Sequence, residues 1–201
     1  MKITTKQQLR ELYDQPSGRA KNKVLHSLEE HAINFINKSP FLVMSTIAKN
    51  GAMDASPRGG VPGFVNVLDN KTLIIPDSKG NNRLDSLSNI IETGTVGLLF
   101  LIPGVDETLR INGKAYISTD KKYLVAFNNE KNIPKACVII TIDELFLHCA
   151  KALMRSKLWR IESQIKRSEL PTMGQMLKDQ LGEMKPAETQ EQMVQRYTKD
   201  L

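Results

Sequence analysis

The segment that most limits how this chain can fold is residues 108–118, in which apolar and polar residues alternate. The residues of one face are small or apolar: Leu109, Ile111, Gly113, Ala115 and Ile117. The residues between them are polar: Arg110, Asn112, Lys114 and Tyr116. Because successive side chains of a strand point to opposite faces, this pattern predicts a β-strand with one face in the core.

Similar strand patterns occur on both sides of this segment. Residues 41–47 and 52–56 flank a turn that contains Asn50-Gly51, a pair typical of hairpins. A second strand pair is predicted at 64–68 and 71–75, with a glycine- and proline-rich loop at 57–63 before it. Residues 96–102 are apolar on both faces and so belong to a central strand, and a last strand begins near residue 138. We expect about six antiparallel strands in a mainly β, α+β fold that closes into a barrel, which removes exposed edges.

Helices are predicted before, between and after the strands. Thr4 or Thr5 caps a short helix that ends near Tyr13. A second helix would end at Ser39-Pro40, because the residue before proline avoids helical angles. Its apolar face would hold Val24, Leu28, Ala32 and Phe35.

The tail after Ser163 is polar and helical, and it is broken at Pro171, Gly182 and Pro186. A narrow apolar seam is predicted in it, formed by Met173, Met176, Leu177 and Leu181. We expect this tail to be an arm that packs on the barrel or on a partner chain. The predicted organisation is a domain at 1–162 with its N-terminal helices, followed by a helical extension at 163–201.

Charge and composition exclude several classes of protein. The net charge of +6 and pI of about 9.3 allow a polyanion partner, and they also allow a site for a phosphorylated small molecule. No apolar run is long enough for a membrane helix, and residues 1–6 lack the apolar core of a signal peptide. Two cysteines and three histidines give neither a disulfide framework nor metal-ligand spacing. We therefore expect a cytoplasmic protein without a metal site.

Residues 73–84 combine a strand, a turn and the start of a helix. The apolar run ends at Pro76, a turn containing Gly80 follows, and helical spacing begins near Arg83. Unpaired backbone N–H groups at such a junction favour an anion, and Lys79 and Arg83 add positive charge. Two interpretations remain open: a phosphate cradle, or an ordinary surface connection before a helix.

A second basic stretch runs from Cys149 to Arg160 and contains the only tryptophan. It is either a solvated helix face or a clamp in which Trp159 and its cations hold an anionic, aromatic ligand. A nucleic-acid groove would use the same residue types, but no aromatic residues are interleaved with basic ones along a strand. No nucleophilic triad, carboxylate pair or glycine-rich nucleotide motif is present. Nucleic acid is therefore not the expected partner.

Several short segments, taken together and in order, resemble a known family. They are Ser39-Pro40-Phe41, Ser56-Pro57-Arg58-Gly59, Pro62-Gly63-Phe64-Val65, Ile75-Pro76-Asp77, Gly80-Asn81-Asn82-Arg83, Thr108-Leu109-Arg110-Ile111-Asn112-Gly113, His148-Cys149-Ala150-Lys151-Ala152 and Arg155-Ser156-Lys157-Leu158-Trp159. The chain resembles the pyridoxamine 5′-phosphate oxidase-like, FMN-binding split-barrel superfamily. It is similar to a subgroup of FMN-dependent enzymes without an assigned substrate. The resemblance spans roughly residues 5 to 160.

The resemblance implies a homodimer with FMN held at the subunit interface. It implies that the phosphate lies where a strand meets the next helix, at Lys79, Gly80, Asn81, Asn82 and Arg83. Ser56 and Arg58 would reach the phosphate or the flavin edge, and the backbone of Ile75, Pro76 and Asp77 would line the ring. Arg110, Lys151, Arg155 and Trp159 would come from the partner subunit.

Two positions depart from the family pattern. Gly60 stands where relatives are expected to have an acidic residue, and Ser78-Lys79 replaces a more usual arginine-containing pair. The C-terminal substrate signature of true pyridoxamine phosphate oxidases is absent, so vitamin B6 oxidation is not expected.

The expected function is that of an FMN-dependent oxidoreductase of unknown substrate, with no side chain named as catalytic. The alternatives are a flavin-binding sensor or carrier without turnover, and a split barrel that binds haem or a deazaflavin.

Overall fold

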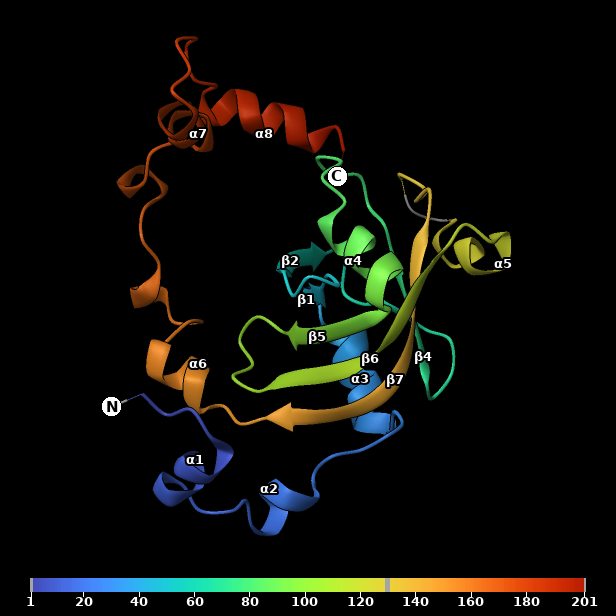
Figure 1. Ribbon diagram of the computed structural model, residues 1–201. Helices are drawn as coiled ribbons and strands as arrows, with labels where there is room; N and C mark the ends of the chain where they lie inside the picture. The colour runs from blue at the N-terminus through green and yellow to red at the C-terminus, as the bar shows by residue number, and fades with distance from the viewer. Residues whose placement is uncertain (1, 129–130, 201) are drawn as a thin grey trace.

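The computed structural model describes residues 2–128 and 131–200, and it contains one antiparallel sheet with helices around it (Figure 1). The seven strands are β1 (Phe41–Ile47), β2 (Met53–Gly59), β3 (Asn66–Val67), β4 (Thr72–Pro76), β5 (Thr95–Leu101), β6 (Thr108–Ser118) and β7 (Cys137–His148). Their order across the sheet is β2-β1-β5-β6-β7-β4-β3. The expected α+β class is confirmed, with one strand more than the six or so predicted.

The alternation that predicted β6 also explains the core. Leu109, Ile111 and Ala115 are buried, whereas Lys114 and Tyr116 are exposed. The inward residues of β1 and β5 join them in one large apolar cluster. A smaller cluster lies apart from it and consists of Ile74, Phe127, Cys137 and Ile139. β5 is third of the seven strands, flanked by β1 and β6.

β6 and β7 form the longest strand pair, and a register shift interrupts it between Asn112 and Gly113. Glycine is required at this bulge, because a Cβ atom on Gly113 would lie 2.2 Å from the backbone oxygen of Thr141. The two backbones therefore approach more closely than any side chain allows.

The helices are α1 (Lys6–Leu12), α2 (Gly18–Asn22), α3 (Glu30–Lys38), α4 (Asp85–Thr93), α5 (Lys121–Leu124), α6 (Lys151–Ser156), α7 (Met173–Leu181) and α8 (Gln190–Thr198). Short 3₁₀ turns are η1 (Val125–Phe127), η2 (Ile161–Ser163) and η3 (Arg167–Glu169). The cap at Thr5 is confirmed, since its hydroxyl accepts a hydrogen bond from Gln8 N. α4 begins two residues after Arg83, close to the predicted start.

The predicted second helix is wrong in its first half. Leu25 N donates to the Leu145 carbonyl at 2.9 Å, and Leu28 N donates to the Asn70 carbonyl at 2.7 Å. These contacts hold the chain extended along the barrel, and helix α3 starts only after Glu29, whose carboxylate caps it. Val24 and Leu28 therefore lie in a non-helical segment, and Leu28 joins the core from it.

The region between β2 and β4 also differs from expectation. β2 continues through Pro57 to Gly59, because it is an edge strand whose outer side needs no N–H donor. The strand predicted at 64–68 shrinks to Asn66–Val67. The loop predicted to begin at Pro57 therefore begins after Gly59, which brings Arg58 into the sheet.

The first and last segments of the chain lie outside the apolar core. No described residue in 2–27 or 146–200 is buried. Figure 1 shows the tail leaving the barrel after α6, arching outwards and returning so that the end of α8 lies beside the turn after β4. The tail thus does not pack along its own barrel, which was one of the two expected arrangements. Among the described helices, none combines the length and apolar character needed to cross a membrane.

Candidate functional site

A cleft of about 1030 Å³ opens where strand β2, the turn after β4 and the start of helix α4 meet. The loop at 131–135 closes its far side. The residues that line it most directly are Asp54, Ser56, Arg58, Phe64, Pro76, Asp77, Ser78, Lys79, Gly80, Asn81, Asn82, Arg83, Leu84, Asp85, Ser86, Lys131, Ile133 and Lys135. Polar and cationic groups from four separate segments therefore share one cavity.

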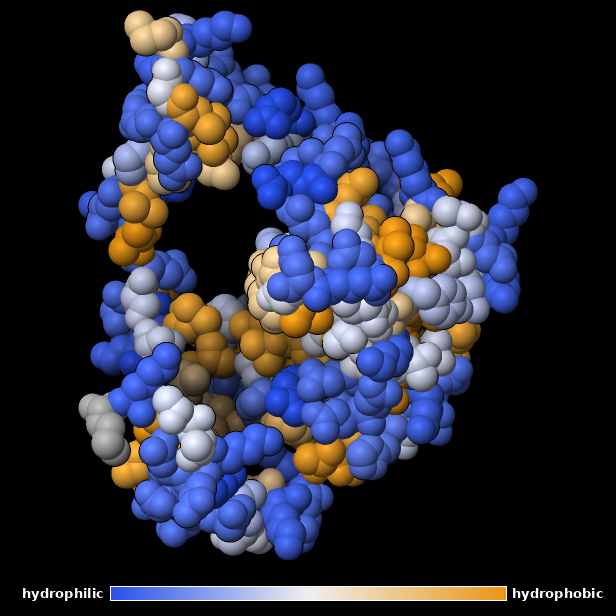
Figure 2. All heavy atoms as spheres, viewed as in Figure 1, coloured by the Kyte–Doolittle hydropathy of each residue, from blue (hydrophilic) through white to orange (hydrophobic). Residues whose placement is uncertain are grey.

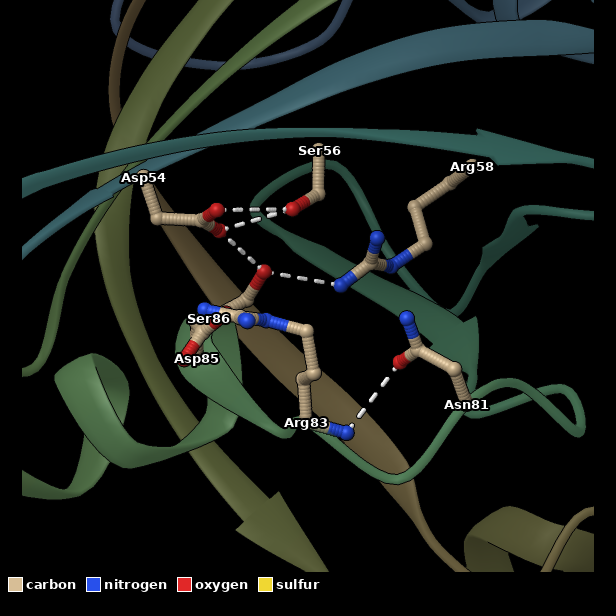
Figure 3. A network of polar contacts seen from close by, with 7 residues as sticks. All are labelled: Asp54, Ser56, Arg58, Asn81, Arg83, Asp85 and Ser86. Atoms are coloured by element: carbon tan, nitrogen blue, oxygen red, sulfur yellow. Dashed lines mark hydrogen bonds and ion pairs between the residues drawn. The ribbon is translucent and has the colours of Figure 1, made fainter. Parts of the chain in front are cut away.

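Strand β2 supplies one wall through Asp54, Ser56 and Arg58, which alternate along the strand and so share a face (Figure 3). Ser56 Oγ donates to Asp54 Oδ1 at 2.8 Å, and Ser86 Oγ donates to Asp54 Oδ2 at 2.5 Å. Arg58 Nη2 in turn donates to Ser86 Oγ at 2.9 Å. This chain of hydrogen bonds ties β2 to the first turn of α4 and fixes the direction of the guanidinium.

The turn between β4 and α4 is built from left-handed residues. Asn82 has a φ of 61° and Leu84 has a φ of 60°, whereas Gly80 does not have a left-handed φ. Asn81 Oδ1 accepts a hydrogen bond from Arg83 N at 3.1 Å, which closes the turn (Figure 3). Leu84 is the N-cap of α4 and provides no side-chain cap. The first N–H groups of α4 therefore face the cleft without a capping side chain, a favourable place for an anion.

Acidic residues offset part of the positive charge in the cleft. Arg83 Nε pairs with Asp85 at 2.8 Å, and Lys79 Nζ pairs with Asp200 of the C-terminal tail at 2.6 Å. Burial raises the pKa of the Asp77 carboxyl above its usual range, although Arg58 nearby acts in the opposite direction. Arg58 is half-buried, whereas Lys79 and Arg83 are exposed. The Arg58 guanidinium donates to two uncharged groups, the Pro57 carbonyl and the Ser86 hydroxyl.

Comparison with known proteins agrees with this architecture. Residues 28–149, more than half of the chain, match the family model described as pyridoxamine 5′-phosphate oxidase. The chain belongs to the pyridoxamine 5′-phosphate oxidase family. No curated protein matches the sequence significantly.

The solved structures of HupZ have a similar fold. The crystal structure of HupZ from Group A Streptococcus is 19% identical, with a TM-score of 0.51 over 60% of this chain and 93% of that chain. A single-residue variant of HupZ gives the same identity and TM-score over 98% of its chain. A candidate pyridoxamine 5′-phosphate oxidase from Lactobacillus delbrueckii is 22% identical, with a TM-score of 0.47 over 62% of this chain and 98% of that chain.

In this family member the predicted site residues divide into two groups. Those that line the cleft are Ser56, Arg58, Pro76, Asp77, Lys79, Gly80, Asn81, Asn82 and Arg83. Ile75 does not line it, because its side chain is 1% exposed and lies in the core. Strand β3 pairs with β4 only as far as Ile74, so the backbone after Ile74 has no strand on that side. The expectation for Ile75 concerned its backbone, and it stays a prediction.

The second group lies outside this cleft. Arg110 is on the outward face of β6, where it pairs with Glu144 at 2.6 Å and its guanidinium carbon lies 4.0 Å from the centre of the Phe146 ring. Lys151 and Arg155 are on α6. Trp159 Nε1 donates to the Val105 carbonyl at 2.9 Å beside a small cavity of about 190 Å³. One chain does not bring these four residues to the cleft.

Two residues of the polar network, Asp54 and Ser86, were not predicted from the sequence. Asp54 could have been found, because it precedes Ser56 by two residues and so shares its strand face. Ser86 had no such signal, since its role depends on α4 packing beside β2. Among the described residues, no cluster of His, Cys, Asp and Glu is arranged to hold a metal ion.

The departure at position 60 has a steric explanation. A Cβ atom on Gly60 would lie 2.7 Å from Cβ of Phe64, whose ring lines the cleft. An acidic side chain at this position would displace that ring. The glycine therefore shapes the cleft wall.

Proposed function

We propose that this protein is an FMN-binding flavoprotein whose phosphate site is the junction of β4 and α4. The observation that carries the proposal is the uncapped start of α4, which opens into a large cleft beside Arg58. A phosphate there accepts hydrogen bonds from backbone N–H groups and is favoured by the helix dipole. Family membership and the sequence resemblance support the choice of FMN among phosphorylated ligands.

The residues of the cleft fit such a group. Arg58 is oriented by Ser86, and it can turn its remaining N–H groups toward a phosphate without leaving that hydrogen bond. Asn81 closes the turn by accepting a hydrogen bond from Arg83 N, and so fixes the shape of the loop. Lys79 and Arg83 are exposed at the rim, and each already pairs with a carboxylate, which offsets part of its charge. The predicted order of importance is therefore Arg58 first, then the two rim cations.

The flavin ring is proposed to lie against the backbone at 75–77 and beside Ser56. FMN, when bound, supplies hydride or electron transfer, and the protein supplies orientation. The hydroxyl of Ser56 is held by Asp54 and so presents its lone pairs in a fixed direction. Asp77 lies in the same cleft, where burial raises the pKa of its carboxyl.

The remaining site residues are proposed to act across a dimer interface. Arg110, Lys151, Arg155 and Trp159 lie outside the cleft of their own chain, which supports a site completed by a second copy. We further propose that the protein works as an oxidoreductase in a reducing cytoplasm. Its cysteines are both free thiols in the structure, one buried and one exposed, which is compatible with that compartment.

The cofactor is tested by titrating FMN into the protein and into two variants. Arg58→Ala removes a charge-assisted hydrogen bond of about 1.5–3 kcal/mol, so the dissociation constant should rise by roughly 10- to 150-fold. Lys121→Ala, which removes an exposed charge on α5, should leave the constant within about twofold, and Arg83→Ala should lie between them. A wild-type protein that takes up no FMN would refute the cofactor. Equal affinities of the Arg58 and Lys121 variants would refute the placement.

The oxidoreductase role is tested separately from binding. The bound flavin is mixed anaerobically with NADH, NADPH or dithionite, and its absorbance is followed. Bleaching by a nicotinamide donor faster than that of free FMN supports an enzyme. A flavin that only dithionite reduces would instead support a carrier or sensor.

A further inference from the structure

The C-terminal arm, defined as residues 157–200, exposes an unusual amount of apolar side chain. No residue in it is buried, although it contains helices α7 and α8 and two 3₁₀ turns. Its large apolar residues that are at least one-third exposed are Leu158, Ile161, Ile165, Leu170, Met173, Leu177, Leu181, Met184, Val194 and Tyr197. The arm lies beyond the segment that matches the family, which ends at residue 149. Ordering such a segment is unfavourable unless these side chains are covered.

Both ends of the arm are attached to the chain's own barrel. At the start, Trp159 Nε1 donates to the Val105 carbonyl at 2.9 Å. At the far end, Asp200 pairs with Lys79 at 2.6 Å, and its carbonyl accepts from Asn132 Nδ2 at 3.1 Å. Between these points the arm stands away from the barrel, and Figure 2 shows an open hollow enclosed by the two. The arm is thus shaped as a clasp with nothing of its own chain inside.

The apolar residues of the arm form a continuous surface on α7. Met173, Leu177 and Leu181 are spaced by four residues, so they form one stripe along the helix. Figure 2 also shows apolar surface along the lower edge of the hollow. An occupant of the hollow therefore contacts apolar surface at this edge.

We propose that the occupant is a second copy of this chain, so that each arm clasps the barrel of the other subunit. If each of the ten exposed apolar side chains buries on the order of 80 Å², one arm contributes about 800 Å², the area per partner of a standard stable interface. The partner's barrel can offer apolar residues on the outward faces of β1 and β5, where Phe41 is 38% exposed and Val43 and Leu99 are half-buried. A two-fold dimer repeats both surfaces on each subunit.

The charge of the arm supports this occupant. Residues 157–200 contain eight Lys or Arg and seven Asp or Glu, so the arm is nearly neutral. A nearly neutral arm can close on a second chain of net charge +6 without strong repulsion. An arm that gripped nucleic acid or an anionic membrane would be expected to carry most of the positive charge instead.

This inference rests on the homodimer of the proposed function, and cross-linking in the full-length protein tests it directly. A benzoylphenylalanine photo-cross-linker replaces Leu177 on the apolar stripe, and in a matched control it replaces Asp179, about 200° around the same helix. We expect a covalent dimer from position 177 and little from position 179. Cross-links from position 177 that stay within one chain would overturn the proposal, because the arm would then fold back on its own barrel.

Deleting residues 164–201 gives a second test. Light scattering and subunit exchange between two labelled pools are compared for the full-length and shortened chains, with far-ultraviolet circular dichroism as the check on folding. We expect at least tenfold faster exchange in the shortened chain, and a similar increase for Leu177→Lys in the full-length chain. Unchanged exchange in both would overturn the clasp.

The outcomes separate this inference from the proposed function. A full-length protein that is monomeric would overturn both the clasp and the proposed homodimer. FMN binding would still be decided by the FMN titration alone. A dimer whose subunits exchange at the same rate with and without the arm would overturn the clasp alone.

Discussion

Replacing Gly113 by alanine should destabilise the barrel more than any other single-methyl change to a glycine of the sheet. The added Cβ atom would lie 2.2 Å from the Thr141 carbonyl oxygen and 3.1 Å from its carbon. Real Cβ contacts begin at about 3.0 Å, so β6 and β7 must move apart at the bulge. The obstacle is the backbone of Thr141, so the clash cannot be relieved by turning a flexible side chain.

The expected cost follows from this separation. Overpacking of a well-packed interior costs about 1–3 kcal/mol, and each weakened hydrogen bond of the strand pair adds about 1 kcal/mol. We therefore expect a loss of about 3 kcal/mol. For a chain of this size, that corresponds to a fall in Tm of roughly 6–12 °C.

The assay is thermal unfolding followed by far-ultraviolet circular dichroism, with Gly80→Ala as the matched control. No atom lies within 4 Å of a Cβ on Gly80, and its φ is not left-handed, so the control should melt within about 2 °C of the wild type. A Gly113→Ala protein that also melts within about 2 °C would refute the close approach of β6 and β7. The bulge between β6 and β7 would then lie at a position other than Gly113.

Three further predictions concern single side chains. Leu84→Gly should raise stability by about 1 kcal/mol in chemical unfolding, because the left-handed φ of 60° strains leucine but not glycine; a decrease would refute the strain. Asp77→Asn should be more stable than the wild type at pH 7 and equally stable below about pH 4. The reason is that a carboxyl whose pKa is raised in the folded state lowers the stability of the fold as pH rises. Equal Tm values of the two proteins at pH 7 would contradict this prediction. Burial, Lys23 and Arg110 lower the pKa of His148 below 6.5, so the contribution of the neutral imidazole to stability is lost as pH falls. The Tm of the wild type should therefore fall more between pH 7.5 and 5.5 than the Tm of His148→Gln. Equal decreases in Tm for the two proteins would contradict this prediction.

The sequence predicted the strands well where one face is buried. The alternation in β6 and the hairpin between β1 and β2 are local patterns, and the structure confirms both. It predicted the β4–α4 junction for the same reason, since a strand, a turn and a helix adjoin within a few residues. The first half of the predicted second helix was wrong, because contacts with Leu145 and Asn70 outweigh the helical spacing of Val24 and Leu28.

The candidate site was predicted only in part. The cleft residues at 76–83 belong to one continuous stretch, so sequence alone grouped them. Ser56 and Arg58 were added through the resemblance to a known family. The hydrogen bond between Arg58 and Ser86 joins residues 28 positions apart, and no local sequence pattern predicts it.

What the sequence by itself determined is the set of elements and their buried faces, because these follow from the periodicity of strands and helices and from caps and turns that act over a few residues. The tertiary structure alone decided which elements meet. The sheet order places β2 and α4 together so that Asp54, Ser86 and Arg58 form one network, and it leaves Arg110 and Trp159 outside the cleft. The path of the tail was decided in the same way, since the pairing of Lys79 with Asp200 spans 121 positions. Contacts over such separations depend on how the whole chain packs, and local propensity does not predict them.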